Sequence, residues 1–332
     1  MRYLQQTKET KKVKTDAKDR KILALLSQNA RIPLTKLAKQ VALSRDAVNY
    51  RIKNYEKDGL IQGYRTMVDI SKFGYNNYHL FLKLNNPSQE IEQKIIKKLE
   101  KYPNIRAIIK FSGNFDFEIA LIAKNIEELD SLITKIISDC FGYMHDYEIL
   151  TITKTYAAET FPPNFSDFKI ERKIEKRETN IDKKDIEILK IIGENAQLPL
   201  YEIGGKVKLS ADAVAYRIKN MINSSTIIKF IPVINYTSLD YNLYTILLNI
   251  SALDKKKEKI LKDFLTSDKN TLWAVKTIGR FNVLIYLLVK DINELQETLL
   301  KLRALFPKEI NHYENLIAYE EYKYVYFPKN LF

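Results

Sequence analysis

Cysteine and histidine are scarce in this sequence. Cys140 is the only cysteine among 332 residues, which excludes an intrachain disulfide and any zinc site built on several thiolates. The three histidines, His79, His145 and His312, show no HxH or HxxxH spacing. We therefore predict no metal site, no cofactor and no catalytic residue. Cys140 lies in the apolar pattern LITKIISDCF, which indicates a buried structural thiol.

Long apolar runs are also missing. No run approaches the 18 residues typical of a transmembrane helix, so we expect no membrane partner. The start, MRYLQQTKETKKVKTD, is basic but lacks the apolar centre of a signal peptide, and we expect a cytoplasmic protein. The net charge of +13 favours a polyanionic partner.

An internal repeat is the strongest feature that the sequence does contain. An offset of 166 residues aligns 15–61 with 181–227 without a gap, and 21 of these 47 positions are identical. The same offset places Gly113 on Gly279 and Tyr147 on Tyr313. The sequence therefore predicts two copies of a unit of about 150 residues.

The first half of each unit has the pattern of a winged helix-turn-helix. In copy 1, residues 16–28 form an apolar helical face with acids in the first turn, and Pro33 begins a short second helix. Ser44 is a natural N-cap for a third helix, which Gly59 ends. The stretch LIQGYRTMVDI then alternates like a short hairpin. In this arrangement the third helix enters the major groove of DNA.

The third helix has polar residues on the side that faces away from the core. Arg45, Asn49 and Lys53 recur at i, i+4 and i+8 and form one outward stripe. Arginine pairs with guanine, asparagine with adenine, and lysine mostly with phosphate. The predicted DNA-binding residues are Ser44, Arg45, Asn49, Tyr50, Arg51 and Lys53, and more weakly Ser210, Tyr216, Arg217 and Lys219. The alternative is a merely solvated face; the capped turn and the basic tail favour double-stranded DNA.

The second half of each unit alternates strands and helices. In copy 1 a strand at 78–85 precedes an amphipathic helix, and two strands meet tightly at Gly113-Asn114. A helix beginning near Asn125 and a final strand complete the order βαββαβ, which is the ferredoxin-like fold. Helices cover one face of such a sheet, so the two copies are expected to bury their other faces against each other. Pairing within one chain and pairing between chains both satisfy this requirement.

These patterns divide the chain into six segments and assign it to the α+β class. The predicted segments are a basic arm (1–14), winged helix-turn-helix copy 1 (15–75), βαββαβ module copy 1 (76–158), a charged linker (159–180), a degenerate winged helix-turn-helix copy 2 (181–240) and βαββαβ module copy 2 (241–332).

Taken together, the motifs resemble those of the leucine-responsive (Lrp/AsnC) transcription regulators. The matching residues are Asp16, Asp19, Ile22, Leu23, Asn29, Ala30, Arg31, Leu43, Ser44, Ala47, Val48, Arg51, Ile52, Lys53, Gly59 and Ile61, with a G-x-F-D turn at 113–116. The resemblance extends over both copies and leaves out only the N-terminal arm and the linker. It implies a DNA-binding regulator that self-associates through its βαββαβ modules, which in this family are effector modules.

The resemblance also implies an amino acid or similar small effector, held near the strand-turn-strand glycine. By position, the candidate residues are Gly113, Asn114, Phe115, Asp116, Gly279, Arg280, Phe281 and Asn282. The alternative is that the glycines serve only a positive φ in a tight turn. The change from Asp116 to Asn282 makes a ligand less expected in copy 2.

Copy 2 departs from the family pattern. Arg45 becomes Ala211 and Asn49 becomes Ala215, which removes the two side chains best suited to read bases. Arg31 becomes Gln197, Gly59 becomes Ser225, and Ala38-Lys39 becomes Gly204-Gly205, which should weaken the second helix. Residues 15–61 carry a net charge of +5 and residues 181–227 only +1, while the arm adds +4. We therefore expect copy 1 to dominate DNA binding.

Two other classes of protein remain open. Siroheme decarboxylases share this two-module fold, including fused two-copy forms, but they look different around the strand-turn-strand region. The segments IIKFSGNFDFEIAL and AVKTIGRFNVLIYL contain no histidine, which favours the regulator. The third reading is a co-regulator that pairs with other family members and binds DNA poorly; the basic arm disfavours it.

Overall fold

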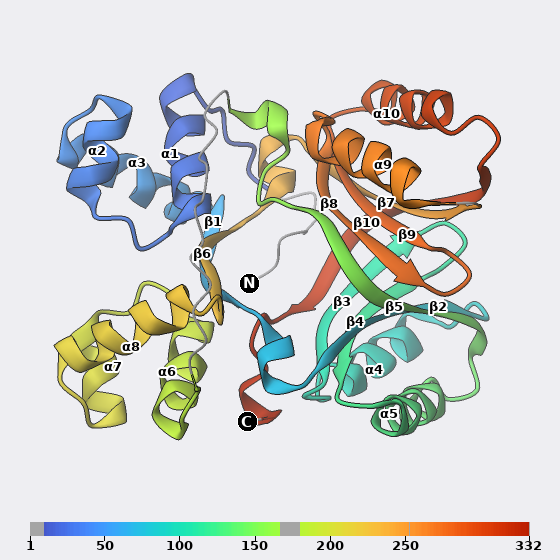
Figure 1. The fold of residues 1–332 in the computed structure, drawn as a ribbon, viewed down its shortest axis with the longest axis horizontal. Coiled ribbons are helices and arrows are strands. Elements are labelled where there is room, and N and C mark those ends of the chain that lie inside the picture. The colour runs from blue at the N-terminus through green and yellow to red at the C-terminus, as the bar shows by residue number, and fades with distance from the viewer. Residues whose placement is uncertain (1–9, 167–179, 252, 332) are drawn as a thin grey trace.

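The computed structural model describes residues 10–166, 180–251 and 253–331. The first nine residues of the predicted arm and residues 167–179 of the predicted linker lie outside the described residues. Figure 1 shows the two helical domains on one side of the molecule and a β-barrel with its flanking helices on the other. The chain folds as two tandem copies of a winged helix-turn-helix followed by a ferredoxin-like βαββαβ module.

Side-chain N-caps mark where the first and third helices of each helical domain begin. Asp16 starts α1 (Ala17–Gln28) with a capping box, and Ser44 starts α3 (Arg45–Lys57) after α2 (Leu34–Val41). Copy 2 repeats these elements at the 166-residue offset as α6 (Lys183–Glu194), α7 (Leu200–Val207) and α8 (Ala211–Asn223). A cap accepts a hydrogen bond from a backbone N–H that the helix itself leaves unpaired, so the retained caps fix where both third helices start.

The expected hairpin after the third helix is wrong. Residues Ile61–Val68 form a single strand, β1, which pairs antiparallel with β6 (Ile227–Ile234) of the other copy. Alternation of apolar residues does not identify a strand's partner, and here the partner is the equivalent strand 166 residues away. This pairing satisfies backbone groups that a lone strand would leave open, and it joins the two helical domains.

The strands of the effector modules close into one barrel. Copy 1 contributes β2 (Asn76–Leu84), β3 (Ile105–Ser112), β4 (Phe117–Ala123) and β5 (Met144–Ala158), and copy 2 contributes β7 (Asn242–Ile250), β8 (Thr271–Ile278), β9 (Val283–Val289) and β10 (Ile310–Tyr324). The order is β10-β3-β4-β2-β5-β8-β9-β7, with β7 returning to β10. The long strands β5 and β10 each pair within their own module and with the other. The expected burial of both sheet faces is confirmed, and it occurs within one chain.

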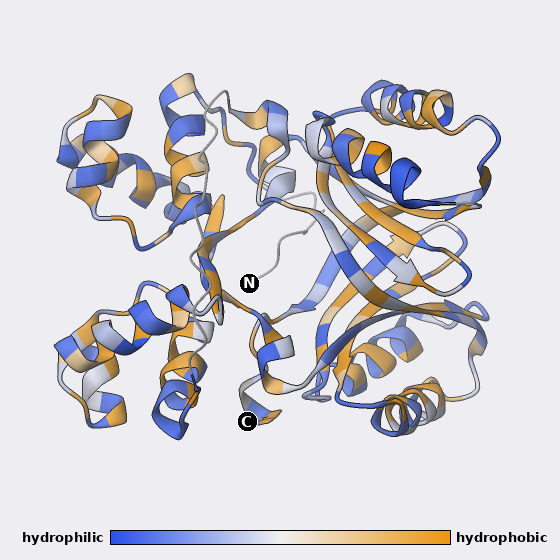
Figure 2. Cartoon of the chain, viewed as in Figure 1, coloured by the Kyte–Doolittle hydropathy of each residue, from blue (hydrophilic) through white to orange (hydrophobic). Residues whose placement is uncertain are grey.

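Helices cover the outside of the barrel. These helices are α4 (Gln89–Leu99), α5 (Ile126–Asp139), α9 (Lys255–Ser267) and α10 (Ile292–Leu305). Along β2, Leu80 and Leu82 pack beneath the helices of copy 1, while Phe81 belongs to the core shared with copy 2. This two-residue alternation produces the mixed colouring of the strands in Figure 2.

Short 3-10 helices follow four of the strands along the chain. They are Ile70–Phe73, Pro163–Phe165, Tyr236–Leu239 and Lys329–Leu331. The first links β1 to β2 and the third links β6 to β7, so each of them joins a helical domain to the module of its own copy.

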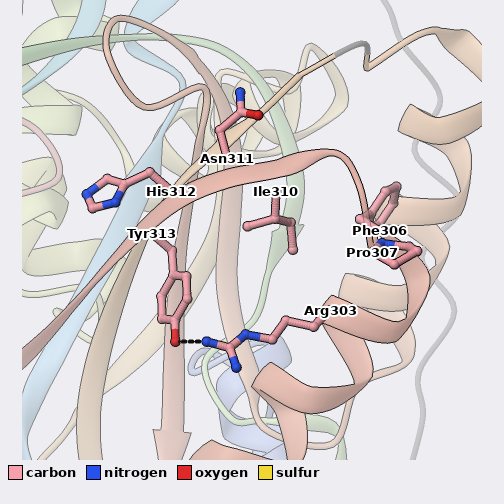
Figure 3. Close-up of a pocket in the computed structure, with 7 residues that line it drawn as sticks. All are labelled: Arg303, Phe306, Pro307, Ile310, Asn311, His312 and Tyr313. Carbon is pink, nitrogen blue, oxygen red and sulfur yellow. Dashed lines mark hydrogen bonds between the residues drawn. The ribbon is translucent and has the colours of Figure 1, made fainter.

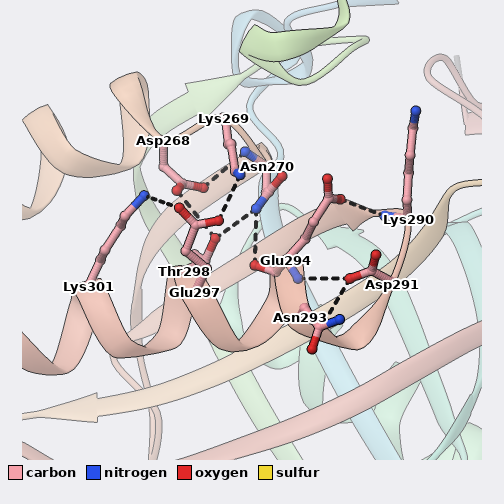
Figure 4. A network of polar contacts seen from close by, with 10 residues as sticks. All are labelled: Asp268, Lys269, Asn270, Lys290, Asp291, Asn293, Glu294, Glu297, Thr298 and Lys301. Atoms are coloured by element: carbon pink, nitrogen blue, oxygen red, sulfur yellow. Dashed lines mark hydrogen bonds and ion pairs between the residues drawn. The ribbon is translucent and has the colours of Figure 1, made fainter.

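Polar side chains anchor α10 to the start of β8. Asn270 donates to the hydroxyl of Thr298 at 2.9 Å and to the backbone oxygen of Glu294 at 3.2 Å, and Thr298 donates to Asp268 (Figure 4).

Glu258 on α9 binds Lys276 of its own copy at 2.8 Å and Lys154 of copy 1 at 2.6 Å. These two hydrogen-bonded ammonium groups lower the pKa of Glu258 to about 2.

Cys140 is completely buried, as the sequence predicts, and burial raises its pKa to about 11. Its thiol donates to the backbone oxygen of Ile136. Within the described residues, no helix is long and apolar enough to cross a membrane. The described side chains also include no cluster of three potential metal ligands.

Ser225 is the basis of a stability prediction. It has φ of +60° where Gly59 in copy 1 has +74°, and its hydroxyl is buried without a hydrogen-bond partner among the described residues. A residue with a Cβ is strained in this region, so Ser225→Gly should raise the free energy of unfolding by about 1 kcal/mol. Gly59→Ser is the matched control and should lower it by a similar amount. Denaturant unfolding measures both, and no gain from Ser225→Gly would contradict the assignment of strain.

Candidate nucleic-acid interface and effector pocket

Packing of α3 determines which of its side chains are exposed. Val48, Ile52 and Tyr55 are buried against the domain core. Arg45 and Lys53 are exposed on the opposite side. The remaining predicted residues of this helix differ: Tyr50 is 67% exposed, Asn49 is partly buried, and the hydroxyl of Ser44 accepts from the backbone N–H of Ala47 at 3.1 Å.

Arg51 lies elsewhere on α3. Its guanidinium binds Asp16 at 2.9 Å and also Asp19, both at the start of α1, and Tyr55 donates its hydroxyl to Asp19. The hydrogen bonds that Arg51 donates to the carboxylates of Asp19 and Asp16 raise the pKa of its guanidinium. Burial, followed by the hydrogen bond to Asp19, raises the pKa of Tyr55, so its phenol remains a donor. Arg51 therefore ties α3 to α1, and its charge is balanced within the protein.

Copy 2 has the same ion pairs between its third and first helices but lacks the equivalent of Tyr55. Arg217 binds Asp182 at 2.7 Å and Asp185 at 2.9 Å, but Met221 replaces Tyr55. A shallow pocket of about 400 Å³ lies here, between the start of α6 and α8. On the outer side of α8, Tyr216 is 67% exposed and Lys219 is exposed, while the hydroxyl of Ser210 caps the helix by accepting from Ala213.

Arg31 in copy 1 and its equivalent Gln197 in copy 2 each contact the helical domain of the other copy. Arg31 donates to the backbone oxygens of Ala196 at 2.6 Å and Leu198 at 3.1 Å, and Gln197 donates to that of Ala30 at 3.0 Å. Desolvation lowers the pKa of Arg31. This difference between the copies therefore adjusts the contact between the two helical domains.

Gly204 also has a structural explanation. A Cβ there would collide with the backbone oxygen of Leu209, whereas Gly205 has open space. Glycine at 204 allows α7 and α8 to approach closely, so at this position the expected weakening of α7 is offset by a tighter turn.

The described end of the basic arm crosses between the copies. Lys11 pairs with Asp58 of copy 1 at 2.5 Å, whereas Lys12 pairs with Asp240 of copy 2 at 2.7 Å. The backbone N–H of Val13 donates to Ser238 of copy 2. Two of the arm's charges are therefore engaged by carboxylates.

The strand-turn-strand glycines lie against strands of the other copy. Gly113 has φ of +147°, and a Cβ there would lie 2.7 Å from the side chain of Leu316 on β10. Gly279 has φ of +150°, and a Cβ there would lie 2.6 Å from the backbone oxygen of Ile149 on β5. The positive φ and the close approach to a strand of the other copy each require glycine. The geometry of the barrel is therefore sufficient to explain why these two residues are glycines.

Most other residues of the two turns have partners inside the protein. Phe115 and Phe281 are buried in the shared core. Asp116 accepts from the backbone N–H of Leu84 at 2.7 Å, and Asn282 makes the equivalent bond to Ile250 at 2.9 Å.

Asn114 and Arg280 lie at the tips of these turns. Asn114 accepts from Lys83 at 3.0 Å and donates to Glu314 of copy 2 at 3.3 Å. Arg280 is exposed, and its backbone N–H donates to Glu148 of copy 1 at 2.9 Å. Each turn tip thus contacts the opposite copy.

A pocket of about 500 Å³ lies beside the copy 2 turn (Figure 3). Its lining residues are Arg303, Phe306, Pro307, Ile310, Asn311, His312 and Tyr313. Asn311 donates to Asn249 at 2.9 Å, and Asn249 donates to the backbone oxygen of Arg280 at 2.5 Å. The pocket and the turn are therefore joined by two hydrogen bonds.

Two polar residues of this pocket's lining, Arg303 and His312, are specific to copy 2. Arg303 stacks on Tyr313 and donates to its hydroxyl, and the equivalent of Arg303 in copy 1 is Ile137. His312 binds Glu314 at 2.9 Å, and its equivalent is Asp146. The sequence prediction missed this pocket; a comparison of the copies around the final strands would have revealed the unmatched arginine and histidine.

Models of known families match both helical domains. Residues 15–62 match a family described as winged helix-turn-helix DNA-binding, and residues 181–222 match the AsnC-type helix-turn-helix domain. The chain is therefore a winged helix-turn-helix DNA-binding protein.

Curated relatives define the family. The chain is 34% identical over 114 residues to the proline dehydrogenase transcriptional activator of Rhodobacter capsulatus, covering 34% of this chain and 74% of the relative. It is 30% identical over 122 residues to the regulatory protein AsnC of Haemophilus influenzae, covering 36% and 81%. The chain belongs to the Lrp/AsnC family and is a sequence-specific DNA-binding transcriptional regulator.

A solved structure matches the architecture of the whole chain. The siroheme decarboxylase NirDL aligns over 95% of this chain and 96% of its own, with a TM-score of 0.62 and 14% sequence identity. At this identity the likeness concerns the fold alone.

Proposed function

We propose that this regulator is a covalent pseudo-dimer in which copy 1 reads the base sequence and copy 2 mainly contacts phosphate. The observation that carries the proposal is the difference between the exposed faces of α3 and α8. Arg45 is exposed on α3, and Ala211 occupies the same place on α8. Arginine can make two hydrogen bonds to guanine, whereas alanine offers no polar group.

The shared residues divide into two roles. Tyr50, Lys53, Tyr216 and Lys219 are exposed in both copies and are proposed to contact the DNA backbone or groove. Ser44, Ser210, Arg51 and Arg217 are proposed to shape the helices, because caps and carboxylate pairs occupy them. Asn49 completes the base-reading set on α3.

Arg45→Ala should reduce specific DNA affinity by about 1–3 kcal/mol, because a bidentate base contact is lost. Lys219→Ala in copy 2 should cost less and weaken binding to all sequences alike. Lys53→Ala is the matched control for Lys219→Ala, since the two lysines are equivalent. Gel-shift titrations at several salt concentrations would measure these effects. Equal losses from Arg45→Ala and Lys219→Ala would contradict the proposed asymmetry.

We further propose that a small effector carrying a carboxylate, such as an amino acid, binds in the Arg303 pocket. Arg303 supplies a guanidinium beside the ring of Tyr313, and the lining also contains the amide of Asn311, a set that suits a carboxylate on a partly apolar body. The pocket's link to Arg280 offers a route by which a bound effector would alter contacts between the copies.

We propose no catalytic activity for the chain, because the pocket of copy 2 offers a single histidine, His312, which is already paired with Glu314. Titration with single amino acids should raise Tm for one or a few of them. Arg303→Ala should abolish the rise, while Arg280→Ala, as the control at the turn, should retain it. The opposite pattern would place the effector at the turn. Siroheme added to the protein should give no new band in the visible absorption spectrum; a band would favour the decarboxylase reading.

A further inference from the structure

The interior of the barrel contains a buried polar cluster built by both copies. Copy 1 contributes His79 on β2 and Glu118 on β4, which are 7% and 1% exposed. Copy 2 contributes Trp273 on β8 and Tyr286 on β9. Nδ1 of His79 is hydrogen-bonded to Oε1 of Glu118, and the hydroxyl of Tyr286 donates to the same oxygen.

Aromatic contacts complete this cluster. Trp273 stacks on His79 at a centroid distance of 5.5 Å and contacts Tyr286 at 4.9 Å. Burial, followed by the nearby Glu118, raises the pKa of the Tyr286 phenol, which keeps it a donor. The carboxylate of copy 1 therefore depends on a donor that only copy 2 supplies.

The cluster breaks the repeat. At the 166-residue offset, Thr245 is the equivalent of His79, and Leu284 is the equivalent of Glu118. Trp273 and Tyr286 correspond to Ala107 and Ala120 in copy 1. Large polar groups of copy 1 thus meet large aromatic groups of copy 2, and small or apolar residues occupy all four equivalent positions.

We propose that this cluster makes the barrel a heterotypic interface, whose fitting partner is the other copy and not a second molecule of the same copy. In a pair of two copy 1 modules, His79 and Glu118 of each module would face Ala107 and Ala120 of the other. Both buried carboxylates would then lack the phenol donor, and the space that the aromatic rings fill would be empty. Two copy 2 modules would set Trp273 and Tyr286 twice against Thr245 and Leu284, leaving two phenols without an acceptor. Buried polar groups without partners and unfilled space are both destabilising.

Two contacts on the other side of the molecule do not make this distinction. The β1–β6 pairing uses equivalent strands, and Arg31 and Gln197 both donate to backbone oxygens, which every copy possesses. These two contacts therefore do not separate like from unlike pairs, whereas the barrel cluster does. The consequence is that the two copies of one chain are each other's fitting partners.

The test uses the full chain with a protease site inserted between residues 167 and 179, cleaved after folding. Labelled and unlabelled cleaved proteins are mixed, and native mass spectrometry identifies the pairs, since the two fragments differ in mass. Mixed-label pairs demonstrate that fragments have exchanged. The wild-type fragments should form only heterotypic pairs; random proportions, with half of the pairs heterotypic, would overturn the proposal.

Variants determine whether the cluster is responsible. His79→Thr with Glu118→Leu gives copy 1 the residues that copy 2 has at these two positions, removes the buried carboxylate, and should produce homotypic copy 1 pairs. Trp273→Ala with Tyr286→Ala tests the same interface from copy 2 and should produce homotypic copy 2 pairs. Phe117→Ala, next to Glu118 but buried under the helices, is the control for general destabilisation and should leave all pairs heterotypic. Entirely heterotypic pairing in both double variants, or homotypic pairs in Phe117→Ala, would overturn the proposal.

Discussion

Hydrogen bonding between strands of different copies is the constraint on which the rest of the structure depends. β1 pairs only with β6 in its sheet, while β5 and β10 carry the barrel from one module into the other. Open strand edges are costly and prone to association, and these pairings close the barrel completely. The helical domains are thereby held side by side, which gives α3 and α8 a fixed relation (Figure 1).

This arrangement allows two equivalent copies to diverge without separating. The interior of the barrel has become complementary between copies, with Glu118 of copy 1 accepting from Tyr286 of copy 2. The exposed faces have diverged too: Arg45 is replaced by Ala211 on α8, and Arg303 has no counterpart in copy 1. Each difference lies where a symmetric dimer of separate chains would have to carry the same residue twice.

The order of elements was predictable because caps, periodicity and the 166-residue repeat are local signals. Ser44 begins its helix as predicted, Ser210 caps the equivalent helix, and the βαββαβ order is confirmed. The hairpin was wrong because a strand's partner is a long-range choice that alternation does not encode. Arg51 was included among the predicted DNA contacts because spacing does not reveal that Asp16 and Asp19 lie within reach. The barrel cluster was missed because His79 and Tyr286 are 207 positions apart.

The central claim is that one chain presents two unequal DNA readers in a fixed pair. Selection of bound sequences from a random DNA library by the full-length protein tests it most directly. The account predicts an asymmetric site, in which one half is strongly specified and the other, about one helical turn away, shows little base preference. A palindromic site with equally specified halves would contradict it.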